Sequence, residues 1–250
     1  MKVLVCYFSA TGNGFDLAAR LAEKLDADVR NIMTLGKQVV ESYDKVVVVS
    51  SVYYFGLPLP VEQFIQAQAG NFTTRFYLVL HYAGFLGNAR YAGYAKFKEA
   101  VLQIQNVYTL HMPSSYTLYI SEPRVMQMEL LKLAHNKILK IADRIAQDEK
   151  RRIKYNMFEF MDNIHKWRIE HVTEFAKDYV ISGDCTYCGL CEKICPMKNI
   201  SVSGKKVKFK NRCAGCMACF NRCPQMAIRY GKYKGQKRYQ NPFADFEQMK

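Results

Sequence analysis

Eight of the nine cysteines lie between residues 185 and 223 and repeat with one spacing. Each of the two runs reads Cys-x2-Cys-x2-Cys-x3-Cys-Pro. In a chain with no recognisable export signal, clustered thiolates at this spacing favour metal ligation over disulfides. The candidate ligands are Cys185, Cys188, Cys191, Cys195, Cys213, Cys216, Cys219 and Cys223.

Three closely spaced cysteines followed by Cys-Pro are typical of the bacterial arrangement in which the fourth cysteine of each run binds the other run's [4Fe–4S] cluster. Structural zinc, the alternative, uses closed four-cysteine sites built from separated Cys-x2-Cys pairs. We therefore predict two [4Fe–4S] clusters. Cys185, Cys188, Cys191 and Cys223 are expected to bind one, and Cys213, Cys216, Cys219 and Cys195 the other. Residues 182–231 closely resemble the two-cluster bacterial ferredoxin family, although its familiar members are acidic and this segment is basic.

A second candidate site is the loop Ser9-Ala10-Thr11-Gly12-Asn13-Gly14, which lies between an expected strand and an expected helix. Hydroxyls and backbone N–H groups at a helix N-terminus bind phosphate without a basic side chain. No Gly-Lys-Ser/Thr follows, which excludes a Walker A loop, and Leu17 stands where a Rossmann fingerprint has its third glycine. A purely structural turn is the remaining alternative.

Two aromatic, Gly-rich loops are expected at the C-terminal ends of the third and fourth strands, where a flavin ring needs walls. Their candidate residues are Val52, Tyr53, Tyr54, Phe55 and Gly56 in one loop, and His81, Tyr82, Ala83, Gly84 and Gly87 in the other. Any single aromatic here has core packing as its alternative role. Together the three loops resemble the FMN site of the flavodoxin family, over about residues 1–147. The resemblance implies FMN, and the missing dinucleotide fingerprint argues against FAD or a tight NAD(P)H site.

The elements that must position these loops alternate between strand and helix patterns. We expect strands at residues 2–8, 28–32, 45–50, 76–81 and 107–111, and helices at 15–25, 60–68, 89–103 and 125–152. This spacing predicts an α/β, flavodoxin-like, doubly wound parallel sheet of order 2-1-3-4-5, followed by a small α+β two-cluster ferredoxin domain. The predicted boundaries are 1–152 for the FMN domain, 153–178 for a helical connector, 179–231 for the cluster domain and 232–250 for a basic tail.

The net charge of +14 is concentrated in residues 151–250, which carry 20 Lys and Arg against 9 Asp and Glu. This excess predicts an acidic redox partner. The run Lys205–Lys210 alternates with apolar residues and predicts a hairpin with one solvated face, and no nucleic-acid reading element is present. Without a signal peptide or an apolar stretch of roughly 20 residues, we expect a cytoplasmic protein with no membrane span. The oligomeric state stays open.

Outside these motifs, Cys6 is expected to be a small buried side chain. His81 and His111 end expected strands on the cofactor side, with a structural role as the alternative. His135, His165 and His171 are expected at the surface. The single Trp167 is interpreted as a packing anchor between connector and domain. No catalytic residue is predicted.

As a whole the chain resembles flavodoxin–ferredoxin fusion proteins of anaerobic bacteria and archaea, which are electron carriers. Such a protein couples one- and two-electron chemistry between its clusters, FMN and a redox partner or small-molecule acceptor. The alternatives are an FMN-dependent reductase of a small organic substrate, fed through its own clusters, and a redox-sensing interaction protein. From the sequence we also expect FMN binding to survive the loss of a cluster, because the FMN loops belong to a domain with its own core.

Overall fold

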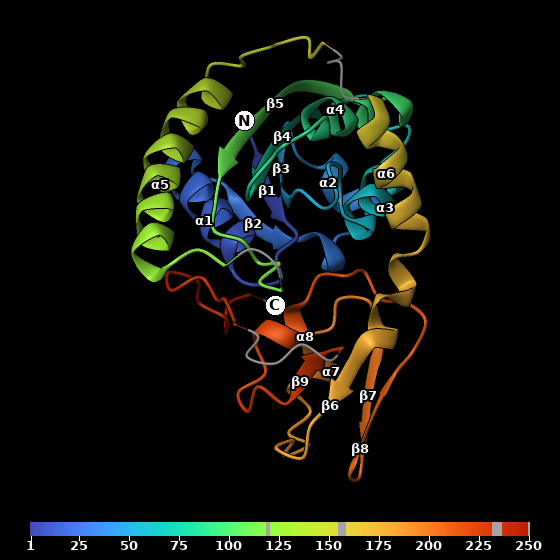
Figure 1. Cartoon of the computed structure of the whole chain (residues 1–250). Helices are drawn as coiled ribbons and strands as arrows, with labels where there is room; N and C mark the ends of the chain where they lie inside the picture. Colours follow the sequence, from blue (N-terminus) through green and yellow to red (C-terminus); the bar gives the residue numbers. More distant parts are fainter. Residues whose placement is uncertain (119–120, 155–158, 232–236, 250) are drawn as a thin grey trace.

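A parallel five-stranded sheet forms the upper part of the molecule in Figure 1. The computed structural model describes residues 1–118, 121–154, 159–231 and 237–249. The strand order is β2-β1-β3-β4-β5, which confirms the predicted flavodoxin-like topology. The strands are β1 (Val3–Tyr7), β2 (Asp28–Asn31), β3 (Lys45–Ser51), β4 (Arg75–Tyr82) and β5 (Gln103–His111).

Helices cover both faces of this sheet, which is why its central strands are apolar almost without interruption. Successive residues of β3 face opposite sides: Val47 and Val49 pack with α1 and α5, and Val46 and Val48 pack with α2, α3 and α4. The helices are α1 (Asn13–Leu25), α2 (Lys37–Glu41), α3 (Leu59–Ala67), α4 (Ala89–Glu99) and α5 (Arg124–Ala146), with a 3-10 turn η1 (Ile32–Thr34). Cys6 is fully buried in the sheet, as expected.

Two helices are shorter than the sequence indicated. The helix expected at 89–103 ends at Glu99, and the left-handed Val101 (φ 57°) turns the chain so that β5 begins at Gln103. The helix expected at 125–152 ends at Ala146, because Asp148 lies 2.7 Å from the buried Lys45 ammonium and accepts a hydrogen bond from Tyr77. The spacing of apolar residues along the sequence does not reveal polar contacts of this kind.

The predicted connector contains α6 (Glu159–Glu170) and the 3-10 helix η2 (Val172–Asp178), while residues 155–158 lie outside the described residues. α6 runs down one side of the sheet domain toward the lower part of the molecule (Figure 1). Met161 and Val172 are buried along this path. The α6 part therefore packs against the sheet domain, whereas Val172 of η2 lies beside Gly215 in the lower part of the molecule.

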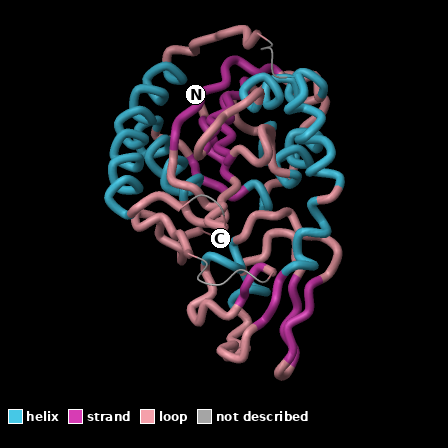
Figure 2. The backbone as a smooth tube through the Cα atoms, viewed as in Figure 1, coloured by secondary structure: helices cyan, strands magenta, loops and turns pink. Residues whose placement is uncertain are grey.

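The lower part of the molecule is a small module of short strands and loops (Figure 2). β6 pairs antiparallel with β9, and β7 and β8 form the hairpin expected around the lysine run. Its elements are β6 (Tyr179–Ile181), α7 (Leu190–Lys193), β7 (Ile200–Ser203), β8 (Lys206–Phe209), α8 (Ala218–Asn221) and β9 (Ile228–Tyr230). Residues 237–249 then return to the start of α1, and the part of the expected tail at 232–236 lies outside the described residues.

Among the described helices, none is long and apolar enough to cross a membrane.

Candidate functional site

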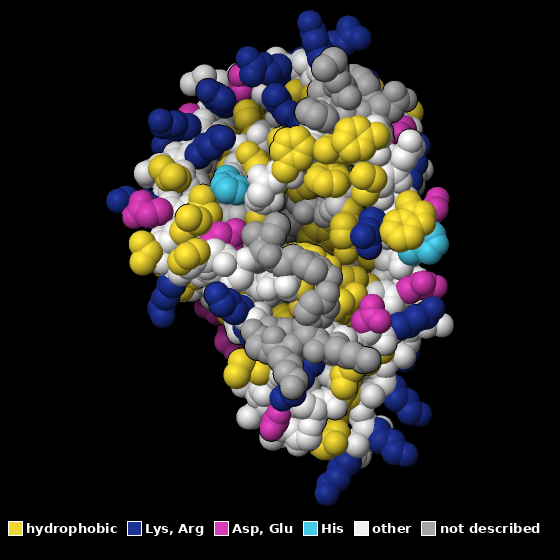
Figure 3. Space-filling view, in the orientation of Figure 1, with side chains coloured by type: hydrophobic (Ala, Val, Ile, Leu, Met, Phe, Trp, Pro, Cys, Tyr) yellow, Lys and Arg dark blue, Asp and Glu magenta, His cyan; other side chains and the backbone are white. Residues whose placement is uncertain are grey.

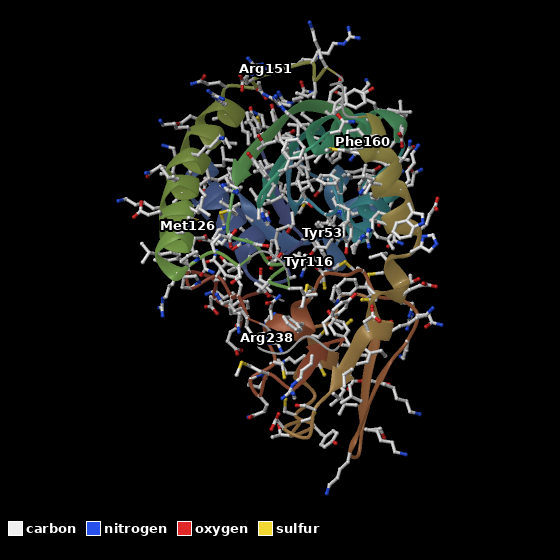
Figure 4. All side chains as sticks on the ribbon, viewed as in Figure 1. Tyr53, Tyr116, Met126, Arg151, Phe160 and Arg238 are labelled. Carbon is white, nitrogen blue, oxygen red and sulfur yellow. The ribbon has the colours of Figure 1, made fainter. Side chains whose placement is uncertain are left out.

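A cavity opens at the carboxyl ends of β3, β4 and β5, between the sheet domain and the module. The empty space inside it and at its open mouth is about 710 Å³. In Figure 3 hydrophobic side chains surround a hollow in this region, and Figure 4 places Tyr53 and Tyr116 beside it. The lining comprises Asn13, Ser51, Val52, Tyr53, Tyr54, His81, Tyr82, Ala83, Pro113, Ser114, Ser115, Tyr116, Gly215, Cys216 and Met217.

The loop after β3 turns sharply and presents two aromatic side chains to the cavity. Tyr53 and Gly56 exchange backbone hydrogen bonds of 2.9 and 3.0 Å. Tyr54 (φ 50°) and Phe55 (φ 69°) are both left-handed, a backbone state that costs of order 1–3 kcal/mol for each such residue. The strain orients Tyr53 and Tyr54 toward the cavity, while Phe55 turns away to pack edge-on against Phe85.

His81, at the end of β4, is a buried and neutral wall of the cavity. Its Nε2 lies 3.1 Å from Ser51 Oγ, and burial lowers the pKa of the imidazole to about 4. The neighbouring Tyr82 packs on His111, whose Nε2 accepts a hydrogen bond from Gly84 N–H. At neutral pH His81 therefore offers one N–H donor and one acceptor without a charge.

The predicted phosphate loop surrounds the N-terminus of α1. Gly12 is left-handed (φ 98°), and no side chain caps the helix. The Ser9 hydroxyl is buried and has no hydrogen-bond partner among the described residues. An unpaired hydroxyl beside the free N–H groups of a helix start fits an anionic phosphate oxygen. Of this loop, Asn13 lines the cavity itself.

One wall of the cavity comes from the module, which the sequence did not predict. Gly215, Cys216 and Met217 face the FMN loops, and Cys216 packs against the core of the sheet domain. The left-handed Gly215 (φ 64°) lies so close to η2 that an added Cβ would be 3.0 Å from the Val172 side chain. The loop Pro113–Tyr116 is the other unpredicted wall. Neither stretch carries a motif that ties it to a flavin.

The eight cysteines of the module surround two separate cavities. Cys185, Cys188, Cys191 and Cys223 line one, together with Cys219 at its edge. Cys195, Cys213, Cys216 and Cys219 line the other. Both predicted crossed sets are thus brought together in space, although their ligation stays a prediction.

The surroundings of these thiols suit a cube of iron and sulfide. Backbone N–H groups of Asn199 and Ala227 donate to Cys195 and Cys223 Sγ, 3.2 and 3.3 Å away. Among the described residues, no three His, Cys, Asp or Glu side chains converge to hold a single metal ion. Thiols that ring a cavity fit the wider spacing of a four-iron cluster. The buried side chain of Tyr179 borders the second cavity.

The two runs fold alike. Left-handed residues recur at equivalent places: Tyr187 (φ 56°) matches Gly215, and Lys198 matches Met226, both with φ 48°. Non-glycine residues rarely adopt this conformation. Its repetition indicates that the two runs share one backbone fold.

Several residues named from the sequence lie away from the cavity. Gly56 packs directly under the His165 ring of α6, where an added Cβ would overlap it, and Gly87 packs between Met161 and Phe55. His165 is therefore buried, contrary to our expectation of a surface residue, and it hydrogen-bonds to Tyr53 O and Glu62. Gly84 binds His111 instead of lining the cavity.

Two further expectations about single residues were wrong. Trp167 is 53% exposed and stacks on His171, so it is not a packing anchor. His135 is largely covered, because its Nε2 lies 2.7 Å from the buried Asp16 carboxylate. His171 is exposed, as expected. Burial and pairing depend on tertiary neighbours that a helical pattern does not specify.

Comparisons with known proteins agree with this division. Residues 4–105 match the flavodoxin domain family, and residues 184–228 match the 4Fe–4S dicluster domain family. The two domains define the class: an electron-transfer protein that uses FMN and iron–sulfur. The chain is a flavodoxin domain fused to a 4Fe–4S dicluster domain.

Solved structures with a similar fold include three flavodoxins. A flavodoxin from the domain Archaea is 19% identical, with 58% of this chain and 99% of that chain covered and a TM-score of 0.42. The flavodoxin of Megasphaera elsdenii is 15% identical, with 54% and 98% covered and a TM-score of 0.41. That of Streptococcus pneumonia TIGR4 is 14% identical, with 59% and 99% covered and a TM-score of 0.43. No curated protein matches the chain.

Proposed function

We propose that this chain carries electrons between an acidic redox partner, two [4Fe–4S] clusters and FMN. Bound FMN accepts electrons singly or in pairs, whereas each cluster carries one, so the combination couples one- and two-electron chemistry. One observation carries the proposal: Cys216, a candidate cluster ligand, lines the same cavity as Tyr53 and His81. The two redox sites therefore share a wall within one chain. We place this activity in the cytoplasm, where thiols stay reduced.

Each group has residues suited to hold it. The loop of residues 9–14 provides a single phosphate site, and Tyr53, Tyr54 and Tyr82 provide flat walls for a flavin ring. One phosphate site without a dinucleotide fingerprint favours FMN over FAD and disfavours tight NAD(P)H binding. Burial raises the pKa of the Cys216 thiol to about 12, so this sulfur ionises only when a cation such as iron replaces its proton.

The positions of the two Cys-lined cavities support an order of transfer. The set containing Cys216 borders the FMN cavity, whereas the set containing Cys185 lies elsewhere in the module. In the set containing Cys185, the side chain of Cys188 is exposed. We infer that electrons exchanged with a partner pass at the Cys188 end, and that Cys216 marks the step toward FMN.

A basic surface supports an acidic partner at this end. Lys205, Lys206, Lys208 and Lys210 are exposed on the β7–β8 hairpin, and none forms an ion pair among the described residues. The acidic side chains nearby are already engaged: Asp184 pairs with Arg229, and Glu192 accepts from Val202 N–H. Figure 3 shows Lys and Arg side chains gathered at the lower end of the molecule. An unpaired cationic face steers an anionic partner toward the exposed cysteine.

The reductase alternative requires open space over the flavin for a substrate. Here the wall opposite the sheet edge is formed by Pro113–Tyr116 and by Gly215–Met217. A flavin ring held in this cavity would meet protein on that side and would have a candidate cluster ligand beside it. The coverage favours a carrier.

The cofactor content tests the proposal directly. Anaerobically prepared protein is expected to contain about 8 Fe and 8 sulfide with one FMN per chain. A redox titration should show one-electron cluster steps that exchange with the flavin. Stoichiometric zinc with little sulfide, or FAD in place of FMN, would contradict it, and rapid direct reduction by NADH would count against the absence of a nicotinamide site.

The basic face is tested by charge reversal. The triple variant Lys205→Glu/Lys206→Glu/Lys208→Glu should slow electron uptake from an acidic ferredoxin or flavodoxin donor. It should also flatten the salt dependence of that rate, because the attraction that salt screens has been removed. The control is Lys132→Glu/Lys137→Glu/Lys140→Glu on α5, which changes the net charge equally. Equal slowing by both sets would show that only net charge matters and would refute docking at the hairpin.

A further inference from the structure

Asn221 is a buried amide in the module that contacts two separate segments around the FMN cavity. It is 1% exposed, ends α8, and stands between Cys219, which lines both Cys-lined cavities, and Cys223, which lines one of them. Ligation at these two cysteines fixes the backbone that carries it. No sequence motif marks this asparagine.

The Asn221 amide forms hydrogen bonds to the loop that follows β5 and lines the cavity. Its Nδ2 donates to Ser115 O over 3.0 Å, and Thr117 Oγ1 donates to its Oδ1 over 3.5 Å. Ser115 lines the cavity. This loop therefore takes its position partly from the cluster module.

Asn221 also forms hydrogen bonds to the returning C-terminal segment. Tyr239 N–H donates to Asn221 Oδ1 over 3.0 Å, and Gln240 Nε2 donates to Asn221 O over 3.1 Å. The guanidinium of Arg238 lies over the ring of Phe220, one residue earlier in α8. Residues 238–240 are thus attached to α8.

The attached segment in turn positions the phosphate loop. Tyr239 Oη donates to Asn13 Oδ1 over 2.6 Å, and Asn241 Nδ2 donates to the same oxygen over 3.1 Å. Asn241 N–H also binds Thr11 O over 2.8 Å. Asn13 completes the set by donating to Pro113 O over 2.9 Å. All these side chains are buried, so a lost partner leaves a polar group unsatisfied.

We propose that Asn221 and Tyr239 are positioning residues that make FMN binding depend on the formed cluster module. Cluster formation orders α8, Asn221 then fixes the 113–117 loop, and Tyr239 fixes Asn13 in the phosphate loop. The inference rests on the proposed function in taking this cavity as the FMN site. It replaces our expectation from the sequence that FMN binding survives cluster loss. Because coupling of binding free energies is reciprocal, bound FMN should also strengthen iron binding by the same factor.

The first measurement is a titration of FMN, followed by quenching of its fluorescence, into flavin-free full-length protein with iron intact and after chelation. Removing iron is expected to weaken FMN binding at least about tenfold, a typical size for coupling between sites. If intact wild-type protein binds no FMN, the proposed function fails. If it binds FMN but iron removal changes the affinity less than about twofold, this inference fails and the proposed function stands.

The second measurement separates positioning from folding. Tyr239→Phe keeps the buried ring and removes one hydroxyl, and should weaken FMN binding about fivefold with iron content unchanged, the range for a single net hydrogen bond. Asn221→Ala should weaken it further. The control is Asn71→Ala, a buried asparagine whose amide oxygen accepts from Thr74 N–H just before β4, at the end of the sheet away from the cavity. Unchanged FMN affinity in iron-replete Tyr239→Phe and Asn221→Ala, or equal weakening in Asn71→Ala, would overturn the inference.

Discussion

The sheet domain buries a large apolar cluster on each face of its sheet, whereas the module's cluster contains five buried residues among those described: Ala176, Tyr179, Met217, Phe220 and Ile228. Around this small cluster the module arranges eight cysteines and several left-handed residues. The first part can fold by excluding water from apolar side chains. The second has a much smaller apolar cluster, so we expect metal ligation to supply much of its stability.

Iron removal should separate the two parts most clearly. Chelating iron is expected to make residues 179–231 sensitive to protease while the sheet domain stays resistant, because only the module depends on ligation. Limited proteolysis with mass spectrometry, beside circular dichroism of the sheet, measures both. A module that stays resistant without iron would show that its apolar contacts suffice.

A core substitution should give the opposite pattern. Leu78→Ala, at a fully buried position of β4, is expected to lower the free energy of unfolding of the sheet domain by about 2–5 kcal/mol. Iron content should stay unchanged under mild conditions. The matched control is Leu133→Ala on α5, which is 62% exposed and should cost within about 0.5 kcal/mol. Equal costs at the two positions would contradict the burial argument.

The crossed cysteine sets sharpen the comparison inside the module. Cys195→Ala should remove about half of the iron and spare the cluster of Cys185, Cys188 and Cys191. Cys223→Ala should have the reciprocal effect. Iron analysis and cluster spectroscopy of the two variants decide the assignment. Selective loss of the Cys185 cluster in Cys195→Ala would refute the crossing.

The smallest expected effect concerns His81. Its folded pKa of about 4 lies below the ordinary value near 6.5, so protonation opposes folding. Stability is full above pH 6.5 and should fall by about 1.4 kcal/mol per pH unit as the pH drops from 6.5 toward 4. Urea unfolding of flavin-free protein at pH 7.0 and 5.5 should show this loss in wild type and a smaller one in His81→Asn. Identical losses would place the acid sensitivity elsewhere.

The sequence was most informative where chemistry fixes spacing. The apolar strand runs match the pattern of a flavodoxin-like sheet, and the cysteine spacing matches the bacterial two-cluster run. These two patterns predicted the sheet order and the grouping of the thiols. The connections between the two parts were not predictable. His165 beneath Gly56, Cys216 in the cavity wall and Asn221 beside Ser115 each bring together residues far apart in the chain. Polar residues of this kind resemble ordinary surface residues until their neighbours are known.

The hydrogen bond from Tyr239 to Asn13 joins residues 226 positions apart. During synthesis, Asn13 leaves the ribosome long before its partner exists, and at about 5–20 residues per second the wait is roughly 10–45 seconds. The sheet can form early in this interval, because residues 1–111 contain all five of its strands. A nascent chain therefore has the candidate flavin loops before it has the segment that contacts them. On the positioning role proposed for Tyr239, stable flavin capture would be a late event of maturation, after the last cysteine has been made.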